Sequence, residues 1–493
     1  MSLIQMHDLT FQYDGACEPV FSHLTLQLDT RWRLGLVGRN GRGKTTLLRL
    51  LSGALSPAAG SVSLPVPASC FPFSIPRDDA MTLEALEDLL PGLEEWRLLR
   101  ELNLLDTDPE VLYRPLSTLS GGERVKVQLA ALFQQPDSYL LIDEPTDHLD
   151  QTGREAVSRY LSGKDGFLLV SHDRAFLDGC ADHILSLDRE GVRLIRGNFS
   201  TWQQETQRRN AWEQAENDKL KKDIKRLEGA ARRTAVWSDR TESGKYAVRN
   251  SGLRPDRGFV GHKAAKLMKR SKAAEDRRQQ AVEARSALLR NVEETDVLFL
   301  RPLVHPSGRL LEFRDFAPDY GSGPVCAPVS FSLRQGERMA LTGPNGAGKS
   351  SLLRAVAGEN VPHTGAVSLT SGLVLSYVPQ DTGGLSGSLT GFAQAGGVEL
   401  TAFLTLLRKL GFERAQFETD LSALSQGQKK KALLARSICQ SAHLYLWDEP
   451  LNYVDVFSRI QIEEMLRDTG ASLLLVEHDR AFLDAIGAQT ISL

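Results

Sequence analysis

Short apolar runs occur near both ends of this 493-residue chain and alternate with stretches of helical periodicity. Four-residue apolar runs of this kind predict strands that are buried on both faces, separated by helices. The runs lie at 34–37, 139–142 and 167–170 toward one end, and at 339–342, 444–447 and 473–476 toward the other. A helix is predicted over 45–51, directly after the first run. The pattern therefore predicts two α/β regions, each built on a parallel sheet.

The region between them has a different pattern. Residues 201–228 contain few Pro or Gly and many charges, and apolar residues recur at heptad-like spacing on both sides of a segment with several Gly. The apolar positions are Trp212, Ala215, Leu220, Ile224 and Leu227 before that segment, and Leu267, Ala274, Ala281 and Leu288 after it. The spacing predicts an antiparallel helical hairpin with its apex near 243–262, and a helix of about 35 residues would extend roughly 50 Å. A solvated charged linker is the alternative interpretation.

Charge is segregated along the chain. Residues 201–290 carry 23 Lys and Arg against 12 Asp and Glu, a net charge of +11, whereas the whole chain has a net charge of -3. The densest part, 231–270, carries 11 basic and 3 acidic residues. A basic middle between acidic ends indicates a nucleic acid or another anionic partner.

The overall composition is that of an ordinary globular protein, with 41% hydrophobic and 25% charged residues. No apolar run approaches the ~18 residues that a membrane span needs, and the first residues lack a secretory pattern. Five cysteines are scattered without paired spacing, which favours reduced thiols over disulfides or a metal site. These features predict a cytoplasmic protein without a membrane segment.

Three motifs occur twice, in the same order and 305 positions apart. The first is a glycine-rich phosphate-binding loop (P-loop). The loop residues, with the one that follows, are Gly38, Arg39, Asn40, Gly41, Arg42, Gly43, Lys44, Thr45 and Thr46 in one copy, and Gly343, Pro344, Asn345, Gly346, Ala347, Gly348, Lys349, Ser350 and Ser351 in the other. The other motifs are Leu-Ser-Gly-Gly-Glu, repeated as Leu-Ser-Gln-Gly-Gln, and Asp-Glu-Pro. A repeat of this extent predicts two copies of one nucleotide-binding domain.

The repeat defines the expected organisation. We predict an α/β fold with two tandem P-loop ATPase domains joined by a long helical hairpin. The first domain is expected over 1–199, the basic hairpin over 200–298, and the second domain over 299–493.

The repeated residues carry the chemistry of ATP hydrolysis. Glycines let backbone N–H groups point at phosphate oxygens, and the loop lysine adds a positive charge. A hydroxyl after that lysine and a carboxylate after a buried strand are oxygen ligands suited to Mg²⁺; these are Thr45 and Asp143 in one copy, Ser350 and Asp448 in the other. The next acid is placed to activate water, and a histidine after the following strand is placed near the γ-phosphate. The candidate catalytic residues are Glu144, Glu449, His172 and His478.

The Leu-Ser-Gly-Gly-Glu segment, at its spacing from Asp-Glu-Pro, resembles the signature of ABC ATPases; in isolation it would be a helix N-cap. In that family the signature of one domain completes the ATP site of the other, so Lys44 would face Ser425 and Lys349 would face Ser120. The signature residues are Ser120, Gly121, Gly122, Glu123, Ser425, Gln426, Gly427 and Gln428. Tyr13 and Tyr320, upstream of each loop, are candidates for stacking on adenine, with ordinary packing as the alternative.

The two copies depart from the ABC pattern at different places. Gln380 stands where ABC domains present a glutamine to the metal and the water, whereas Phe73 stands there in the first copy. Gln426 replaces a signature glycine in the second copy. The two sites are therefore predicted to be inequivalent.

Two ABC domains joined by a basic helical hairpin resemble the ABC-F family of translation-associated ATPases, over essentially the whole chain. The segments 256–272 and 447–455 are similar to those of antibiotic-resistance members of the Lsa and Vga types. This resemblance implies ATP and Mg²⁺ as cofactors, and a monomer that closes around nucleotide and binds the E site of the bacterial ribosome. It also implies that the hairpin reaches past the P-site tRNA and 23S rRNA to displace lincosamides, pleuromutilins and streptogramin A.

Basic and aromatic residues of the hairpin are the candidate ribosome contacts, because they can pair with phosphates and stack on bases. They are Trp237, Lys245, Tyr246, Arg249, Phe259, His262, Lys263, Lys266, Lys269 and Arg270. A housekeeping ABC-F factor acting on stalled ribosomes has the same fold and partner, and remains an alternative. The ATPase subunit of a membrane importer is a remote alternative, since it has no reason to carry a basic hairpin.

Overall fold

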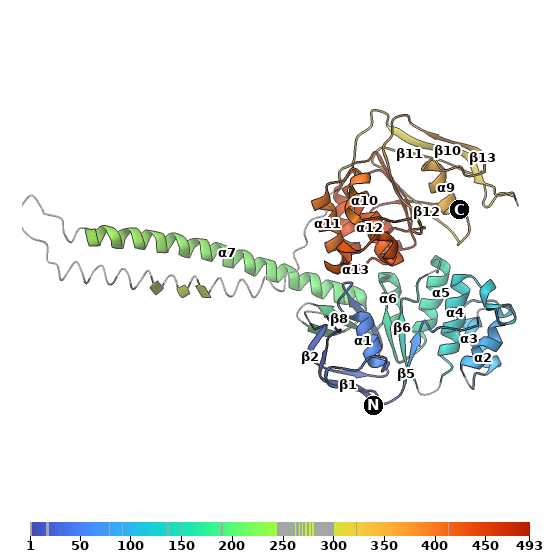
Figure 1. Cartoon of the computed structure of the whole chain (residues 1–493), viewed down its shortest axis with the longest axis horizontal. Coiled ribbons are helices and arrows are strands. Elements are labelled where there is room, and N and C mark those ends of the chain that lie inside the picture. Colours follow the sequence, from blue (N-terminus) through green and yellow to red (C-terminus); the bar gives the residue numbers. More distant parts are fainter. Residues whose placement is uncertain are drawn as a thin grey trace, which may run out of the picture. The chain divides into compact units, whose positions relative to one another are not determined.

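The computed structural model describes residues 2–15, 19–77, 79–90, 92–135, 138–147, 149–188, 191–243, 300–321, 323–412 and 414–493, with nine isolated positions between 244 and 299. The chain forms two compact units, Met1–Ser200 with Asp296–Leu493, and Thr201–Thr295. The first unit contains two α/β domains, which Figure 1 shows in blue to cyan and in yellow to red.

The first domain has a large sheet of strand order β5-β6-β7-β3-β8-β9 and a small antiparallel sheet of order β2-β1-β4. The strands are β1 (Leu3–Phe11), β2 (Phe21–Asp29), β3 (Arg33–Gly38), β4 (Ala59–Ser63), β5 (Ala68–Phe71), β6 (Tyr139–Asp143), β7 (Phe167–Val170), β8 (His183–Asp188) and β9 (Gly191–Arg196). The helices are α1 (Lys44–Leu51), α2 (Thr82–Leu89), α3 (Glu95–Leu104), α4 (Gly121–Leu132), α5 (Gln151–Ser162) and α6 (Arg174–Cys180), with 3-10 turns at Pro109–Tyr113 and Leu116–Thr118.

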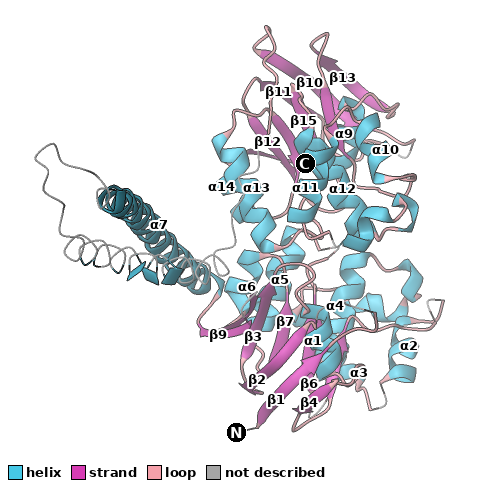
Figure 2. Ribbon diagram, turned by 60° about the vertical axis from the view of Figure 1, so that its left-hand side comes forward, coloured by secondary structure: helices cyan, strands magenta, loops and turns pink. Residues whose placement is uncertain are grey.

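The central strands are apolar at nearly every position because the sheet is covered on both faces, and Figure 2 shows helices flanking it. All four residues of β7 and the first four of β6 are buried. Parallel pairing sets Leu36 of β3 and Asp143 of β6 opposite Val170 of β7. The carboxyl ends of the three strands therefore meet at one edge, which carries the P-loop, Asp143 and His172.

The second domain repeats this plan, with a five-stranded parallel sheet of order β14-β15-β16-β12-β17 and a small antiparallel sheet of order β11-β10-β13. The strands are β10 (Arg309–Pro318), β11 (Val329–Arg334), β12 (Arg338–Thr342), β13 (His363–Leu369), β14 (Leu375–Val378), β15 (Leu444–Asp448), β16 (Leu473–Val476) and β17 (Gln489–Ser492). The helices are α9 (Lys349–Val356), α10 (Leu389–Ala395), α11 (Leu400–Lys409), α12 (Gln426–Cys439), α13 (Val456–Asp468) and α14 (Arg480–Ala485), with 3-10 turns at Arg414–Glu418 and Leu421–Ala423. All six strands predicted from apolar runs are thus confirmed.

The two small sheets share one backbone irregularity. Asp8 in β1 and Asp315 in β10 have positive φ values of 49° and 43°, and the strand register shifts beside each of them. The facing Gly60 and Gly365 also have positive φ values, 82° and 77°. A Cβ atom on Gly60 would lie 2.3 Å from the Asp8 carbonyl oxygen, and one on Gly365 would lie 2.1 Å from that of Asp315. Only glycine fits such an approach of two backbones.

The described part of the second unit is dominated by helix α7, Phe199–Ser243, which spans 45 residues and ends where the predicted apex begins. Among the described residues, no helix is both long enough and apolar enough to cross a membrane. Of the predicted ribosome contacts, His262, Lys266 and Lys269 are described, and all three are exposed helical positions. The side chains of Trp237, Lys245, Tyr246, Arg249, Phe259, Lys263 and Arg270 lie outside the described residues.

The apolar seam predicted for this helix is wrong at its first two positions. Trp212 is 61% exposed and Ala215 is also exposed, whereas Glu213 and Asn217 are buried. The buried and half-buried positions Trp202, Thr206, Arg209, Glu213 and Asn217 follow a helical spacing of three and four, and all but Trp202 are polar. Apolar identity alone therefore selected the wrong face of the helix. The remaining seam positions lie outside the side chains that the structure describes.

We expect Gly365→Ala to lower the melting temperature more than Gly372→Ala does. The two glycines have φ values of 77° and 78°, so alanine at either one is strained by about 1–2 kcal/mol. Only at Gly365 does the added Cβ meet a backbone oxygen, whereas nothing lies within 4 Å at Gly372. Overpacking adds about 1–3 kcal/mol at Gly365. Thermal unfolding followed by circular dichroism measures the difference, and equal melting temperatures would contradict the prediction.

Candidate nucleotide-binding sites

Each P-loop is a tight connection between a buried strand and a helix. Gly43 and Gly348 lie at the helix N-caps with φ values of 90° and 82°, which glycine adopts without strain. The Lys44 Nζ atom donates to the Gly38 carbonyl oxygen at 2.7 Å. The Lys349 Nζ atom donates to the Gly343 and Pro344 carbonyl oxygens at 2.9 and 2.8 Å. Both lysines are therefore folded back along their loops, and burial lowers their pKa values.

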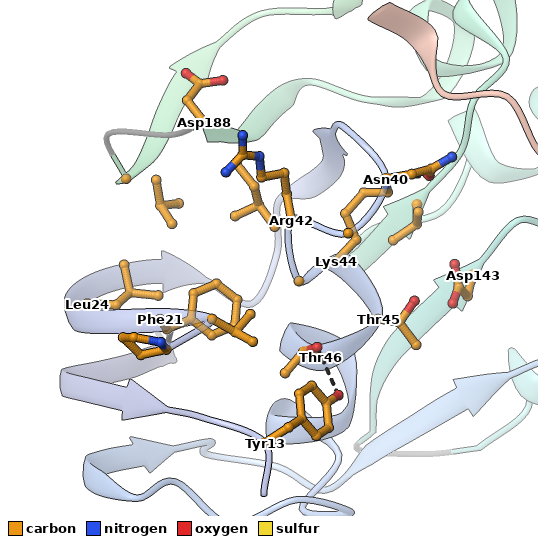
Figure 3. A pocket seen from close by; sticks show the side chains of 18 of the residues that line it. Tyr13, Phe21, Leu24, Asn40, Arg42, Lys44, Thr45, Thr46, Asp143 and Asp188 are labelled. Carbon is orange, nitrogen blue, oxygen red and sulfur yellow. Dashed lines mark hydrogen bonds between the residues drawn. The ribbon is translucent and has the colours of Figure 1, made fainter. Parts of the chain in front are cut away.

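The first P-loop opens into a cavity of about 1250 Å³, which is large enough for a nucleotide. The Tyr13 hydroxyl lies 3.0 Å from the Thr46 hydroxyl (Figure 3), and in the second domain the Tyr320 hydroxyl lies 2.8 Å from that of Ser351. Tyr13 and Tyr320 are 40% and 52% exposed. Their rings are thus available at the rim, and stacking on adenine remains a prediction.

Other residues that line this cavity were not predicted from the sequence. Phe21, Leu24 and Asp188 belong to it, and Figure 3 shows Arg42 directed toward Asp188. Asp188 ends strand β8, beside the P-loop strand. The rule that ligands bind at the carboxyl ends of parallel strands would have indicated it.

The catalytic candidates of the first domain lie together at the sheet edge. Burial raises the pKa of Asp143 to about 6. Glu144 has a φ value of 47°, and one of its carboxylate oxygens accepts from the His172 backbone N–H at 3.2 Å. The His172 Nε2 atom lies 3.4 Å from the other oxygen. Burial and the charge of Lys44 lower the pKa of His172 well below its usual value, so the imidazole is neutral at pH 7.

The second domain has the same arrangement with small differences. Asp448 is 1% exposed, and burial raises its pKa to about 6. Glu449 again has a φ value of 47°, and it accepts a hydrogen bond from the Asn452 amide at 2.8 Å. The His478 Nε2 atom lies 3.9 Å from Glu449, and burial lowers the His478 pKa to about 4. In each domain a neutral imidazole thus lies beside the glutamate, and in the first domain burial raises the pKa of Glu144 well above its usual value.

The oxygen groups of the second site fit a magnesium ion. The Ser350 hydroxyl donates to the Gln380 side-chain oxygen at 3.2 Å. Both carboxylate oxygens of Asp448 are buried, and the nearby Ser350 hydroxyl partly offsets the rise in the pKa of this carboxyl. A hard divalent cation between these groups and phosphate oxygens would satisfy them. In the first domain the matching hydroxyl and carboxylate belong to Thr45 and Asp143, which Figure 3 places around the end of the loop.

The two signatures begin helices α4 and α12. Ser120 accepts from the Glu123 backbone N–H at 3.2 Å, and the Glu123 carboxylate accepts from the Ser120 N–H at 2.7 Å. Ser425 and Gln428 form the same capping box in the second domain. The remaining N–H groups of each first turn are free of helical partners, which is where an anion binds.

The structure brings the first P-loop and the second signature together. A cavity of about 640 Å³ is lined by Asn40, Gly41 and Thr45 on one side and by residues 425–428 on the other. The Asn40 side-chain amide donates to the Tyr453 carbonyl oxygen at 3.1 Å. This is the head-to-tail pairing that the ABC resemblance implies for Lys44 and Ser425.

Buried ion pairs accompany this pairing, and sequence reasoning missed them. The Arg174 guanidinium donates to Glu463 of the other domain at 3.1 Å. Within the domains, Arg154 pairs with Asp173 at 3.0 Å and Arg459 pairs with Asp479 at 3.2 Å. The arginines of the last two pairs are 305 positions apart and the aspartates 306. The repeat in the sequence could therefore have indicated that both pairs are equivalent.

Comparison with known proteins agrees with this geometry. A family model described as ABC transporter matches residues 21–147 and 326–452. The fold and sites thus define a tandem ABC ATPase, which confirms the predicted fold class and ATP hydrolysis. The archaeal ribosome recycling factor aABCE1, in complex with stalk protein aP1, has a similar fold, with a TM-score of 0.62 and 19% identity over 98% of this chain and 87% of that one.

Similar proteins indicate which group of ABC ATPases the chain belongs to. ATP-binding protein Uup of Caulobacter vibrioides is 30% identical over 97% of this chain and 75% of the relative. Ribosome protection protein VmlR of Bacillus subtilis is 29% identical over 96% and 83%. Energy-dependent translational throttle protein EttA of Haemophilus influenzae is 26% identical over 94% and 86%. The chain belongs to the ABC family and, with these relatives, to its ABC-F group.

We expect Mg²⁺-dependent ATP binding to weaken as the pH falls through about 6. The pKa values of Asp143 and Asp448 are raised to about 6, so both carboxyls gain a proton below that pH. A protonated carboxyl is a poor metal ligand, so metal affinity should fall up to about tenfold per pH unit. Titrating a fluorescent ATP analogue between pH 5 and 8, with Mg²⁺ or with EDTA, measures the effect. The Asp143→Asn, Asp448→Asn variant is the control, and an equally steep pH dependence in it would contradict the assignment.

Proposed function

We propose that this protein is an ABC-F ATPase that acts on the bacterial ribosome and resides in the cytoplasm. The observation that carries the proposal is a basic helical insertion between two ABC domains, in a chain that matches VmlR and EttA over most of its length. The names of those relatives concern ribosome protection and translation. The aABCE1 neighbour supports the fold alone.

Two ATP molecules bind between the domains, each held by one P-loop and the opposite signature helix. Lys44 and Lys349 leave their backbone carbonyls and pair with phosphate oxygens. Glu144 and Glu449 orient the attacking water and accept its proton, while the neutral imidazoles of His172 and His478 donate toward the γ-phosphate. A magnesium ion supplies charge neutralisation at the phosphates, held by Thr45 and Asp143 or by Ser350, Gln380 and Asp448.

The basic insertion is the proposed ribosome-binding element. His262, Lys266 and Lys269 recur at spacings of four and three on exposed helical positions, so they share one face. Such a face neutralises RNA phosphates, and the remaining candidate contacts lie beside it in the sequence. ATP-driven closure of the two domains, each bound to one end of the insertion, couples nucleotide state to ribosome binding.

We further propose that the protein protects the ribosome from antibiotics. In this mechanism the closed protein occupies the E site, and the insertion reaches past the P-site tRNA to the peptidyl-transferase centre of 23S rRNA. Lincosamides, pleuromutilins and streptogramin A are displaced there, and hydrolysis releases the protein. The likeness to VmlR supports this function. The likeness to EttA supports a second candidate, a housekeeping factor that acts on translating ribosomes without drug.

Expression of the chain in a susceptible bacterium is expected to raise the inhibitory concentrations of lincomycin, tiamulin and a streptogramin A at least about fourfold, and that of a tetracycline not at all. The drug sites of the first three overlap the peptidyl-transferase centre, and the tetracycline site does not. Broth microdilution measures the effect. The Glu144→Gln, Glu449→Gln variant should give no protection, because it cannot complete the cycle. Unchanged susceptibility to all four drugs, at good expression, would leave the housekeeping function as the better proposal.

The same double variant is expected to accumulate on ribosomes when ATP is present. Without the two bases, hydrolysis slows by about 10²–10⁴ and the closed form persists. Sedimentation through a sucrose cushion measures binding, and raising the salt from 50 to 200 mM should weaken it severalfold because phosphate contacts release counterions. The wild-type protein with ADP is the control. A double variant that stays in the supernatant at low salt with ATP would refute ribosome binding.

A further inference from the structure

The two departures from the ABC pattern lie in one and the same ATP site. Phe73 belongs to the domain that supplies Lys44, and Gln426 belongs to the signature of the other domain. The 640 Å³ cavity joins these parts, because Asn40, Gly41 and Thr45 line it together with Gln426. The ABC resemblance assigns the unaltered Leu-Ser-Gly-Gly-Glu signature to the opposite site, which is built on Lys349 and contains Gln380.

Strand pairing establishes that Phe73 occupies the place of Gln380. Phe71 pairs with Ile142 and Val378 pairs with Trp447, and each partner directly precedes the aspartate of its domain. Two residues further along the chain stand Phe73 and Gln380. Gln380 offers an oxygen that already accepts from Ser350 at 3.2 Å.

The segment that holds Phe73 is fixed in position. The Gln128 side-chain amide donates to the Phe73 carbonyl oxygen at 3.2 Å, and Gln128 is buried. In the second domain the carbonyl of Pro379, the residue before Gln380, accepts from Lys430 at 2.7 Å. Both segments are thus anchored through their backbones. At the equivalent position the first domain has the phenyl group of Phe73 and the second has the amide of Gln380.

Gln426 changes the phosphate-facing end of the second signature. It is the first residue of α12, directly after the capping Ser425, and its side chain is exposed and lines the cavity. Glycine at this position leaves only backbone N–H groups. The amide of Gln426 adds a donor to the same place, which strengthens the hold on an anion. The first site therefore has an additional side-chain amide at the signature and lacks the glutamine that ABC domains present to the metal and the water.

We propose that the two ATP sites have separate roles: the Lys44 site retains ATP and hydrolyses it slowly, and the Lys349 site carries out the turnover. The first P-loop and the Glu144–His172 pair are complete, so the Lys44 site binds ATP and keeps a residual rate. Gln380 acts in the Lys349 site as the group that orients the water and holds the metal. This division concerns the ATPase itself and does not depend on the proposed ribosome function.

Rapid-quench analysis of the purified full-length chain tests the division. With both sites filled by [γ-³²P]ATP and an excess of unlabelled ATP added as a chase, we expect a fast and a slow phase of phosphate formation of equal amplitude, separated by at least about tenfold in rate. Glu449→Gln should remove the fast phase and Glu144→Gln the slow one, because each base serves its own site. Equal rates at the two sites, or loss of the fast phase in Glu144→Gln alone, would overturn the proposal.

Exchanging the residues that differ from the ABC pattern between the two sites gives a matched pair of variants. Phe73→Gln with Gln426→Gly should accelerate the slow phase about tenfold or more. The reciprocal Gln380→Phe with Gly121→Gln should slow the fast phase by a similar factor, since Gly121 stands at the position of Gln426 in the first signature. If Phe73→Gln unfolds the protein, Gln426→Gly alone still tests the proposal, because it alters only an exposed side chain. This single variant should release ATP from the slow site faster than the wild-type protein does. Unchanged rates in every correctly folded variant would contradict the roles assigned to these residues.

Discussion

The rest of the structure depends on one constraint, which is that the charged lysine of each P-loop is buried. Lys44 and Lys349 are 8% and 6% exposed, and their ammonium groups donate to loop carbonyl oxygens. Burial of a charge is unfavourable unless other charges compensate for it. Carboxylates of the same domain provide part of the compensation. Another part comes across the interface, where Asp455 lies near Lys44 and Asp150 near Lys349. Nucleotide phosphates would supply further negative charge beside both lysines, which in the proposed mechanism links ATP binding to closure of the domains.

A buried ion pair helps to specify how the two domains meet. Arg174 is 8% exposed and Glu463 is 6% exposed, and the two meet across the interface. A buried pair of this kind contributes little net stability, since desolvation offsets most of the attraction. Removing one partner is costly, however, because it strands the other charge. Such pairs therefore select one register of the two domains over others.

Sequence reasoning succeeded where chemistry and local geometry coincide. The P-loops, signatures and strand-end acids were found because each motif needs particular residues at fixed spacing, and the central strands because apolar runs admit few other folds. It failed where burial depends on a distant partner. Trp212 of α7 is exposed while Glu213 is buried, which no local pattern indicates. Arg174 was missed because its partner Glu463 lies 289 positions away. The position of Phe73 was inferred from the sequence, but the fold was needed to show that Gln426 lies in a cavity with the P-loop of the same domain as Phe73.

The paired kinks at Asp8–Gly60 and Asp315–Gly365 have a consequence for the history of the molecule. The two domains have diverged at catalytic positions, yet both keep an aspartate in the left-handed region against a glycine that no other residue can replace. Independent acquisition of the same strained contact at the same place in two sheets would need several coordinated changes. One ancestral domain already bent its sheet in this way before it was duplicated. The bend of the backbone is therefore part of the repeat, together with the P-loops and the Asp-Glu-Pro motifs.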